Sequence, residues 1–486
     1  MSLLVTTHHP DYDRHFKQWC RNEDAYKGRV KEGRNAEIYL KKPNICYQSS
    51  AKFADNSRAM QTFEAQQQAA EARYSNDILP NALYFNFTQP TVETLVGAIM
   101  RKPPKMTLSS RLAYLEDDVD GKGSSVGQQA RETLEMLCVT GRGFLVVDMP
   151  RVADASRQDN IEGKVAPRIK TYTAKNCINW DTITDGSLTK LSLIVFEELY
   201  KSTLNVFTHE YQPQQLVYRL DNGAAVFEKY RDGEIVDSDF IMVNGSTTDT
   251  LPVFPVGAND NDICPDVAPM TPIVEINLSH YVQYAQYRES IRIAGQPQYA
   301  IDIGEMSDED YKKFNPLGFV TGSAIPMVTK KGSVNLLQFQ ANDAAATELT
   351  NLEKRALSIG AGMLQESSGN ETATAARIRS GAQVARMSAM ANNVGDAYYN
   401  ALVLCDEMMG GNGSEIEFAL NDSFFDAELV AQDIVSLSAA IMQGNYTRES
   451  LFMQLKQAGH VAEEMTFEEW DALTKENDSV GGLFNG

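Results

Sequence analysis

The residues whose types and spacing could do chemistry gather in one acidic run. Within eight residues this run holds five side chains with oxygen atoms, namely Asn259, Asp260, Asn261, Asp262 and Asp266. Hard cations such as Ca²⁺ and Mg²⁺ prefer oxygen ligands, but the glycine and the terminal glutamate of an EF-hand loop are missing here. The run therefore has two interpretations, a structural turn and a cation site.

Other chemical motifs are missing from the sequence. The stretch DGKGSS at residues 120–125 resembles a phosphate-binding loop, but Glu116 stands where a Walker loop requires glycine. Apart from the pair His8 and His9, the six histidines show no metal spacing, and neither GxSxG nor HExxH occurs. The six cysteines are scattered without a CxxC motif, which predicts free thiols. The sequence therefore assigns no catalytic residue, no cofactor and no metal ligand.

Composition indicates a folded, acidic protein of several domains. A chain of 486 residues with 43% apolar and 22% charged side chains is long enough for two or three domains with their own cores. The net charge is −21, and the segment Asp406–Gly486 alone holds 16 acidic against three basic side chains, which would repel nucleic acid. No apolar run approaches the roughly 18 to 20 residues of a membrane span, and no signal peptide pattern is present. We therefore expect an intracellular protein with no membrane partner.

Two long helices around a short polar break are the dominant elements. The break is QESSGNET, Gln365–Thr372, and the second helix, Ala373–Met409, would be roughly 55 Å long. Apolar residues recur at intervals of three and four in both helices, as in helix-on-helix packing. The two rows are Ala345, Leu349, Leu352, Ala356, Ile359 and Met363, and Val384, Met387, Ala391, Val394, Tyr398, Ala401, Cys405 and Met408. All 17 prolines lie at or before Pro326, as expected if the C-terminal part is mostly helical.

Shorter elements precede these helices. Gly143–Met149 reads as a buried strand, and Leu216–Val236 as a meander whose turns fall at Asn-Gly and Asp-Gly pairs. Helices are expected around Asn56–Tyr74 and Thr91–Met100. Another, Ile273–Ile293, carries a tyrosine stripe and is followed by a small insertion that contains strands.

The region after Gly413 is predicted to begin with a short strand near Ile416–Leu420. A helix containing Leu429 to Ile441 follows, then one capped by Thr447. The last helix opens with a capping box, TFEE, at Thr466–Glu469.

The order of these parts resembles the portal, or head-tail connector, proteins of tailed bacteriophages. Four stretches resemble one branch of that family and occur in the same order: RYSNDILPNALYFNFTQPTVETLVGAIMRKPP, LPVFPVG, INLSHYVQYAQYRESIRIAGQPQY and GNETATAARIRS, which begin at Arg73, Leu251, Ile276 and Gly369. The resemblance covers residues 22–473. It implies an α+β, multidomain portal fold with a wing, a two-helix stem, a small clip, a tunnel loop, a long helix and a helical crown.

The resemblance also implies where the parts begin and end. The wing would be residues 1–265, the first stem helix 266–295, the clip 296–340, the second stem helix 341–364, the tunnel loop 365–372, the long wing helix 373–413 and the acidic crown 414–486.

Portal proteins form rings, usually of twelve subunits, at one capsid vertex, and DNA passes through the hole. The resemblance thus implies a non-enzymatic virion protein, assembled in the host cytoplasm, that forms the channel for genome packaging and ejection. The implied partners are other copies of the chain, double-stranded DNA bound non-specifically, the terminase large subunit, the major capsid and scaffolding proteins, and a tail adaptor protein.

The implied tunnel loop consists of Gln365, Glu366, Ser367, Ser368, Gly369, Asn370 and Glu371. Each phosphate that Lys or Arg neutralises strengthens a sequence-independent attachment to DNA, so a loop without basic residues would let DNA slide. The alternative is an ordinary turn between two helices.

Basic and aromatic residues supply further candidates. We expect contacts between subunits and with the channel or the motor, and the alternative for each charged side chain is plain exposure to solvent. The stem channel candidates are Arg288 and Arg292, the clip candidates Lys330 and Lys331, and the inter-subunit candidates Arg377, Arg379, Arg386, Tyr281, Tyr284 and Tyr287.

One hypothesis from a different class of protein stays open. A cation-dependent hydrolase could use Asp260, Asp262 and Asp266 as metal ligands, with the long helices as a dimerisation arm.

Overall fold

The computed structural model describes residues 2–42, 67–68, 70–150, 165–202, 207–295, 298–302, 307, 309–310, 313, 327–329, 335–337, 343–360, 373–422, 441, 447–457, 461–462 and 465–481. They form a mixed α+β protein with two compact units. The first unit is Met1–Gly97 with Pro103–Leu420, and the second is Ala98–Lys102 with Asn421–Gly486. The elements discussed below as a functional site belong to the first unit.

The largest sheet of the first unit is antiparallel and has the strand order β4-β5-β6-β7-β8. Its turns confirm the predicted meander, because Asn222 and Gly223 have φ angles of 50° and 84° and Asp232 and Gly233 have 51° and 79°. A two-residue hairpin turn of type I′ requires a positive φ at both positions. The strands are Cys177–Asp185, Leu188–Lys201, Tyr211–Asp221, Ala224–Arg231 and Glu234–Phe240.

A smaller sheet with the order β11-β2-β3 lies next to it. Its central strand is the predicted buried run, and helix α7 (Val126–Thr140) leads into it after a capping box formed by Ser125 and Gln128. The three strands are Val253–Gly257, Arg142–Asp148 and Arg168–Thr173. One apolar core joins both sheets to helix α2 (Pro10–Tyr26) and includes Tyr12, Trp19, Phe144, Tyr172, Phe196 and Tyr218.

N-terminal helices form a second apolar core with the middle of the chain. Helix α6 confirms the prediction for Thr91–Met100, whereas the one for Asn56–Tyr74 falls mostly outside the described residues. The elements here are α1 (Ser2–Val5), α2 (Pro10–Tyr26), a 3₁₀ turn (Arg29–Lys31), α3 (Asn35–Tyr39), a π-helical turn (Tyr74–Ile78), α5 (Leu79–Asn81) and α6 (Thr88–Ile99). Their core includes Val30, Leu40, Tyr74, Val274, Leu278 and Tyr281.

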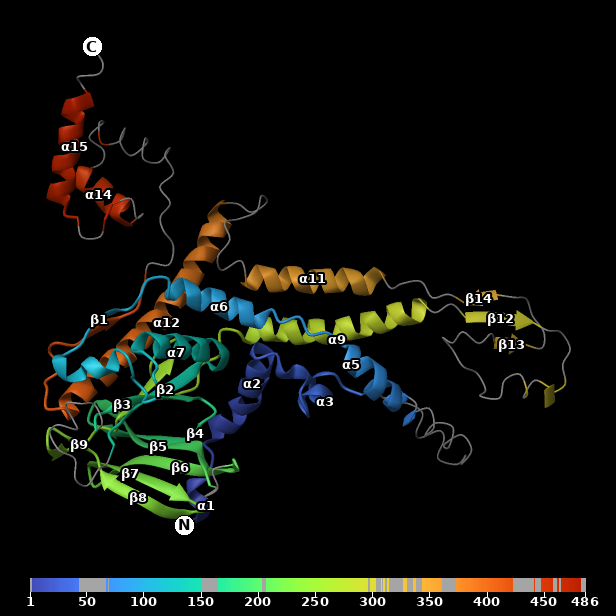
Figure 1. Cartoon of the computed structure of the whole chain (residues 1–486), viewed down its shortest axis with the longest axis horizontal. Coiled ribbons are helices and arrows are strands. Elements are labelled where there is room, and N and C mark those ends of the chain that lie inside the picture. The colour runs from blue at the N-terminus through green and yellow to red at the C-terminus, as the bar shows by residue number, and fades with distance from the viewer. Residues whose placement is uncertain are drawn as a thin grey trace. The chain divides into compact units, whose positions relative to one another are not determined.

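Two helices run side by side next to this core (Figure 1). They are α9 (Thr271–Ala294) and α11 (Asp343–Gly360), as the periodicity predicted. Between them in the chain lies a small sheet with the order β13-β12-β14, which confirms that the insertion contains strands. Its strands are Gln298–Asp302, Met327–Thr329 and Asn335–Leu337.

Helix α12 (Ala373–Met408) is a single continuous helix of 36 residues. Most of its predicted apolar row is buried, but the partners differ from the expectation of helix-on-helix packing. The helix lies across β11 and β15 and also contacts α7 and β2. The Tyr398 hydroxyl donates to Gln129 Oε1 at 3.1 Å within this interface. The chain itself therefore covers most of this row.

The strand predicted near residues 416–420 is confirmed as β15 (Glu417–Ala419). It pairs antiparallel with β1 (Lys105–Thr107), and the first unit ends directly after it at Leu420. A second 3₁₀ turn, Ser110–Leu115, follows β1.

The second unit contains helices α14 (Arg448–Gln457) and α15 (Phe467–Gly481). Thr447 caps α14, because the Ser450 backbone nitrogen donates to its Oγ1 at 3.1 Å. The predicted capping box of α15 is present, with Thr466 N donating to Glu469 Oε2 at 2.9 Å and Glu469 N donating to Thr466 Oγ1 at 3.4 Å. The helix predicted to contain Leu429 to Ile441 lies outside the described residues, apart from residue 441.

Two further expectations concern the described residues as a set. None of their helices has the length and apolar character needed to cross a bilayer. All five of their cysteines are free thiols, while Cys46 lies outside the described part.

Candidate functional site

A single buried amide fixes helix α9 to the segment before α6. Asn277 is fully buried, and its Oδ1 accepts hydrogen bonds from the Tyr84 hydroxyl (2.9 Å), the Phe87 backbone nitrogen (2.9 Å) and Thr88 Oγ1 (3.1 Å). Its Nδ2 donates to the Phe85 carbonyl at 2.6 Å. Because Asn277 is buried and both ends of its amide are paired, this network holds α9 in one orientation relative to the segment.

A buried histidine links α9 to α11. His280 is fully buried, and its Nε2 lies 3.3 Å from Oε1 of Glu353, whose side chain is 51% exposed. The rings of Phe85, Phe87 and Tyr284 surround the imidazole at centroid distances of 5.6, 5.1 and 5.7 Å. Nδ1 has no hydrogen-bond partner among the described residues. The polar contact with Glu353 thus joins the two helices, while the aromatic rings pack the imidazole against the segment before α6.

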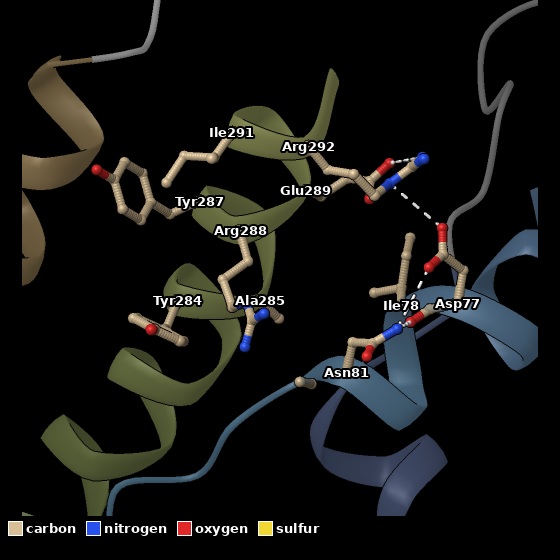
Figure 2. Close-up of a pocket in the computed structure, with 11 residues that line it drawn as sticks. Asp77, Ile78, Asn81, Tyr284, Ala285, Tyr287, Arg288, Glu289, Ile291 and Arg292 are labelled. Carbon is tan, nitrogen blue, oxygen red and sulfur yellow. Dashed lines mark hydrogen bonds and ion pairs between the residues drawn. The ribbon is translucent and has the colours of Figure 1, made fainter. Parts of the chain in front are cut away.

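A pocket of about 640 Å³ opens on one flank of α9, facing the π-helical turn and α5 (Figure 2). Its lining is both apolar and polar and includes Asp77, Ile78, Asn81, Tyr284, Arg288 and Ile291. The wall opposite α9 is the turn Tyr74–Ile78, and π-helical turns frequently occur at functional sites.

One of the two predicted channel arginines is bound in an ion-pair network at this pocket. Arg292 donates through Nε and Nη2 to the two carboxylate oxygens of Glu289, at 3.0 and 3.1 Å. Its Nε also lies 3.2 Å from Asp77 Oδ2, and the Arg73 guanidinium contacts Glu289 from another side. Two acids therefore neutralise two arginines, and the charge of Arg292 is not available to a ligand.

The other predicted channel residue, Arg288, is different. Its side chain is exposed and has no hydrogen bond or ion pair with the described residues. Figure 2 shows the Arg288 side chain between α9 and α5, whereas the side chains of Tyr287 and Ile291, which also border the pocket, extend from α9 in the opposite direction. The structure thus places both arginines on one flank of the helix, and Arg288 brings a free positive charge there.

The tyrosine stripe splits into two kinds of residue. Tyr281 is fully buried in the second apolar core, where burial raises the pKa of its hydroxyl to about 12. Because residues of its own chain cover Tyr281, its side chain is not accessible to another subunit in this structure. Tyr284 and Tyr287 are half-buried and line the pocket.

The acidic run, residues 259–266, surrounds the side chain of Arg142, which comes from an earlier part of the chain. Arg142 is 1% exposed, and its Nη2 lies 3.0 Å from Asp262 Oδ1, 3.2 Å from Asp266 Oδ2 and 3.6 Å from Asp260 Oδ1. Its Nη1 donates to the Asp260 carbonyl at 2.8 Å, and Nη2 also donates to the Cys264 carbonyl. The guanidinium therefore occupies the place that a cation would take between these carboxylates.

Two glycines allow this close approach. A Cβ on Gly257 would lie 2.0 Å from the Asp260 carbonyl oxygen and 2.3 Å from Arg142 Nη1. Gly141 has a φ of 77°, and a Cβ there would lie 2.5 Å from the Asp266 carbonyl oxygen.

In the described part of the chain, no group of three or more His, Cys, Asp or Glu side chains is arranged to hold a metal ion. The acidic run is a structural turn around Arg142, which removes the residues that the hydrolase hypothesis needs.

A second buried charge fixes the end of α12. Asp406 is 2% exposed and accepts hydrogen bonds from Ser109 Oγ (2.5 Å) and the Gly413 backbone nitrogen (3.0 Å), with Arg111 Nη1 at 3.6 Å. Burial acts to raise the pKa of Asp406, but the hydrogen bonds and the arginine more than offset it, so the pKa is lowered. This carboxylate ties the C-terminal end of α12 to the segment after β1.

The remaining predicted residues are only partly described. Arg386 is exposed on α12, and Arg377 and Arg379 lie within the same helix, although their side chains are outside the described part. The tunnel loop, residues 365–371, and the clip residues Lys330 and Lys331 also lie outside the described residues.

Several structural residues escaped the sequence reasoning although each left a signal. Arg142 directly precedes the apolar run GFLVV, where a charged side chain must find buried partners. Asn277 and His280 interrupt the apolar face of α9 three residues apart, and Asp406 follows Cys405 at the end of an apolar row. A polar residue on a face predicted to be buried is thus the pattern to search for.

Comparisons with known proteins give one sequence match and several structural ones. Residues 269–409, from the start of α9 to the end of α12, match a family model described as a domain of unknown function (DUF4055). The comparison with curated proteins found no match.

Three of the structural matches are chains of gene transfer agent (GTA) particles. One is from the virion of a native GTA particle, with 13% identity, a TM-score of 0.36, and coverage of 80% of this chain and 91% of that chain. A second is from the neck of an empty GTA particle computed with C6 symmetry, with 11% identity, a TM-score of 0.38, and coverage of 80% and 93%. A third is from the neck of a native GTA particle computed with C12 symmetry, with 12% identity, a TM-score of 0.35, and coverage of 80% and 91%.

Proposed function

We propose that this protein is a portal protein, which forms a ring at one capsid vertex. The ring would be the channel for genome packaging and ejection and the docking site for the terminase motor and the tail adaptor. One observation carries the proposal. The packed helices α9 and α11 flank a small sheet in the chain, and a 36-residue helix follows them. This order agrees with the one that the resemblance implies for the stem, the clip and the long wing helix. Helices α9 and α12 each overlap a sequence stretch that resembles portal proteins.

The way α9 is held supports a role as a rigid stem. Asn277 fixes one side of the helix through a buried network, and the second apolar core covers the same region. On the α11 side, His280 and the buried row Leu349, Leu352 and Ala356 complete the packing. A channel wall that carries DNA under force needs elements that do not shift relative to each other. A buried polar network whose groups are paired, such as that of Asn277, makes the packing more rigid.

The remaining parts follow from the same proposal. Residues 296–340 would be the clip, with Lys330 and Lys331 near the motor or the adaptor, and residues 365–371 would be the tunnel loop that touches DNA. The acidic residues after 413 would form the crown. Twelve subunits, the capsid and scaffolding proteins as partners, and assembly in the host cytoplasm belong to this proposal.

The proposal is tested by the assembly state of the purified protein. Negative-stain electron microscopy combined with native mass spectrometry should show closed rings with a central hole. A protein that stays monomeric or dimeric at all salt and protein concentrations would refute the portal assignment.

The tunnel loop needs a test of its own. A chain that lacks residues 365–370 should still form rings but should package or retain less DNA in an in vitro packaging reaction. Unchanged packaging by rings of this variant would remove the loop from the mechanism while leaving the ring itself intact.

A further inference from the structure

The α9 and α11 pair has two flanks. The N-terminal helices that bury Tyr281 cover part of one flank, while the side chains of Arg288 and Glu353 on that flank are exposed. The side of α9 that faces α11 is marked by His280 and, two turns later, by Tyr287. The side of α11 that faces α9 is marked by its buried row, Leu349, Leu352 and Ala356. His280 and Glu353 are in contact while α9 and α11 run in opposite directions, so positions along the two helices can be compared from this pair.

Charged residues on the two flanks can be assigned from helical rotation. Each residue of a right-handed α-helix turns by about 100° from the one before it. In an antiparallel pair, the residues that follow a facing residue all lie on one flank, and those that precede a facing residue lie on the other. Arg288 follows Tyr287 and Glu353 follows Leu352, so both lie on the first flank, which carries the pocket.

The second flank carries the opposite arrangement. Glu348 precedes Leu349 and Arg355 precedes Ala356, so this acid and this base lie together on the side of α11 away from the pocket. Arg355 is exposed and Glu348 half-buried, and neither makes a side-chain hydrogen bond or ion pair with the described residues. Each flank thus carries one basic and one acidic side chain, Arg288 with Glu353 on the first flank and Glu348 with Arg355 on the second.

We propose that the first flank of one subunit binds the second flank of the next copy in the ring, with Arg288 paired to the neighbouring copy's Glu348 and Glu353 paired to the neighbouring copy's Arg355. This inference rests on the proposed ring. A ring requires a heterologous interface, in which two different surfaces of the same chain meet, and opposite flanks of one helix pair supply two such surfaces.

The heights of the charges along the helices favour these pairs. Rotation about a ring axis keeps each residue at its own height, so residues that meet must lie at similar levels. Counted from the His280 and Glu353 contact at 1.5 Å per residue, Arg288 and Glu348 differ by about 4.5 Å and Glu353 and Arg355 by about 3 Å. Both offsets have the same direction, so one small tilt of the helix pair brings both charge pairs into line.

Charge reversal tests the contact. R288E and E348R should each lower the fraction of subunits in rings at least about tenfold at a fixed concentration, because like charges then meet at every interface. The double variant R288E/E348R should restore rings. K354E is the matched control, because Lys354 is an exposed base on the side of α11 away from α9. Circular dichroism and melting of each variant confirm that the subunits fold.

Mixing provides a test that an effect within one subunit cannot imitate. In an alternating ring of R288E and E348R subunits, every interface pairs opposite charges, so the mixture should form rings that neither variant forms alone. Single variants that assemble like K354E, or a double variant and a mixture that stay disassembled, would overturn this inference. In either case the wild-type rings would remain and the proposed function would stand, whereas a wild-type protein without rings would refute both.

Discussion

The sharpest prediction about the folded subunit concerns Arg142, whose replacement by methionine keeps much of the volume and removes the charge. The guanidinium donates to the Asp260 carbonyl at 2.8 Å and contacts Asp262 and Asp266 at 3.0 and 3.2 Å. Hydrogen bonds to charged groups contribute about 1.5–3 kcal/mol each, so three of them amount to roughly 5–9 kcal/mol. Burying the charge costs several kcal/mol in return, and breaking a buried pair typically lowers the free energy of unfolding by about 3–5 kcal/mol. We expect R142M to fall in this range.

Two matched variants show whether burial is the cause. R142K keeps the charge, but a compact ammonium cannot reach acceptors on several sides, so we expect about half the loss. D262N changes an acid that is 54% exposed and retains its Oδ1 acceptor, so the free energy should fall by no more than about 1 kcal/mol.

Urea denaturation followed by tryptophan fluorescence measures these differences in the full chain. Trp19 and Trp180 are 2% and 7% exposed in the core that contains β2, so their emission reports on the unit that holds Arg142. If R142M lost less than about 1 kcal/mol, or no more than D262N, the buried arginine would not organise this loop and the argument would fail.

Three further predictions concern the same unit. Millimolar Ca²⁺ or Mg²⁺ should leave its melting temperature unchanged, because a guanidinium occupies the acidic run; a saturable rise would restore the cation site. N277A should lower the free energy of unfolding by about 2–4 kcal/mol, since it leaves the Phe87 nitrogen, Thr88 Oγ1 and the Phe85 carbonyl without this partner, and urea denaturation would measure the loss. The folded-state pKa of Asp406 is lowered, so its stabilisation is present above the unfolded value of about 3.9 and is lost as the pH falls through the folded value. The free energy of unfolding of D406N should therefore lack the pH dependence that Asp406 gives the wild-type protein in acid. Identical acid unfolding profiles of D406N and the wild-type protein would contradict this.

Elements with strong periodicity were predictable from the sequence because local signals define them. Helix α9 was expected at Ile273–Ile293 and spans Thr271–Ala294, and the meander turns follow from Asn-Gly and Asp-Gly pairs that tolerate positive φ. The packing partners were not predictable in the same way. The apolar row of α12 indicated burial, but periodicity does not distinguish a helix from a sheet as the surface that covers it.

In the candidate sites too, local patterns were predictable from the sequence and the partners of each residue were not. The acidic run suggested a cation, and the structure supplies one as Arg142, which is 118 residues away from Asp260 in the sequence. Local spacing cannot reveal a partner brought together by the pairing of β2 with β11. Arg288 and Arg292 looked equivalent in the sequence because they are one turn apart, yet Glu289 and Asp77 neutralise one and leave the other free.

The charged and polar residues of the α9 and α11 pair therefore fall into two groups, and replacing a residue should have a different effect in each group. Asn277, His280 and Arg292 have partners within the chain, so their replacement should first change the stability of a subunit. Arg288 and Glu348 have none in the described part, so these charges should contribute little to the stability of an isolated subunit. If rings form and depend on the second group while the first group sets only the melting temperature, folding and assembly use separate surfaces of the same two helices.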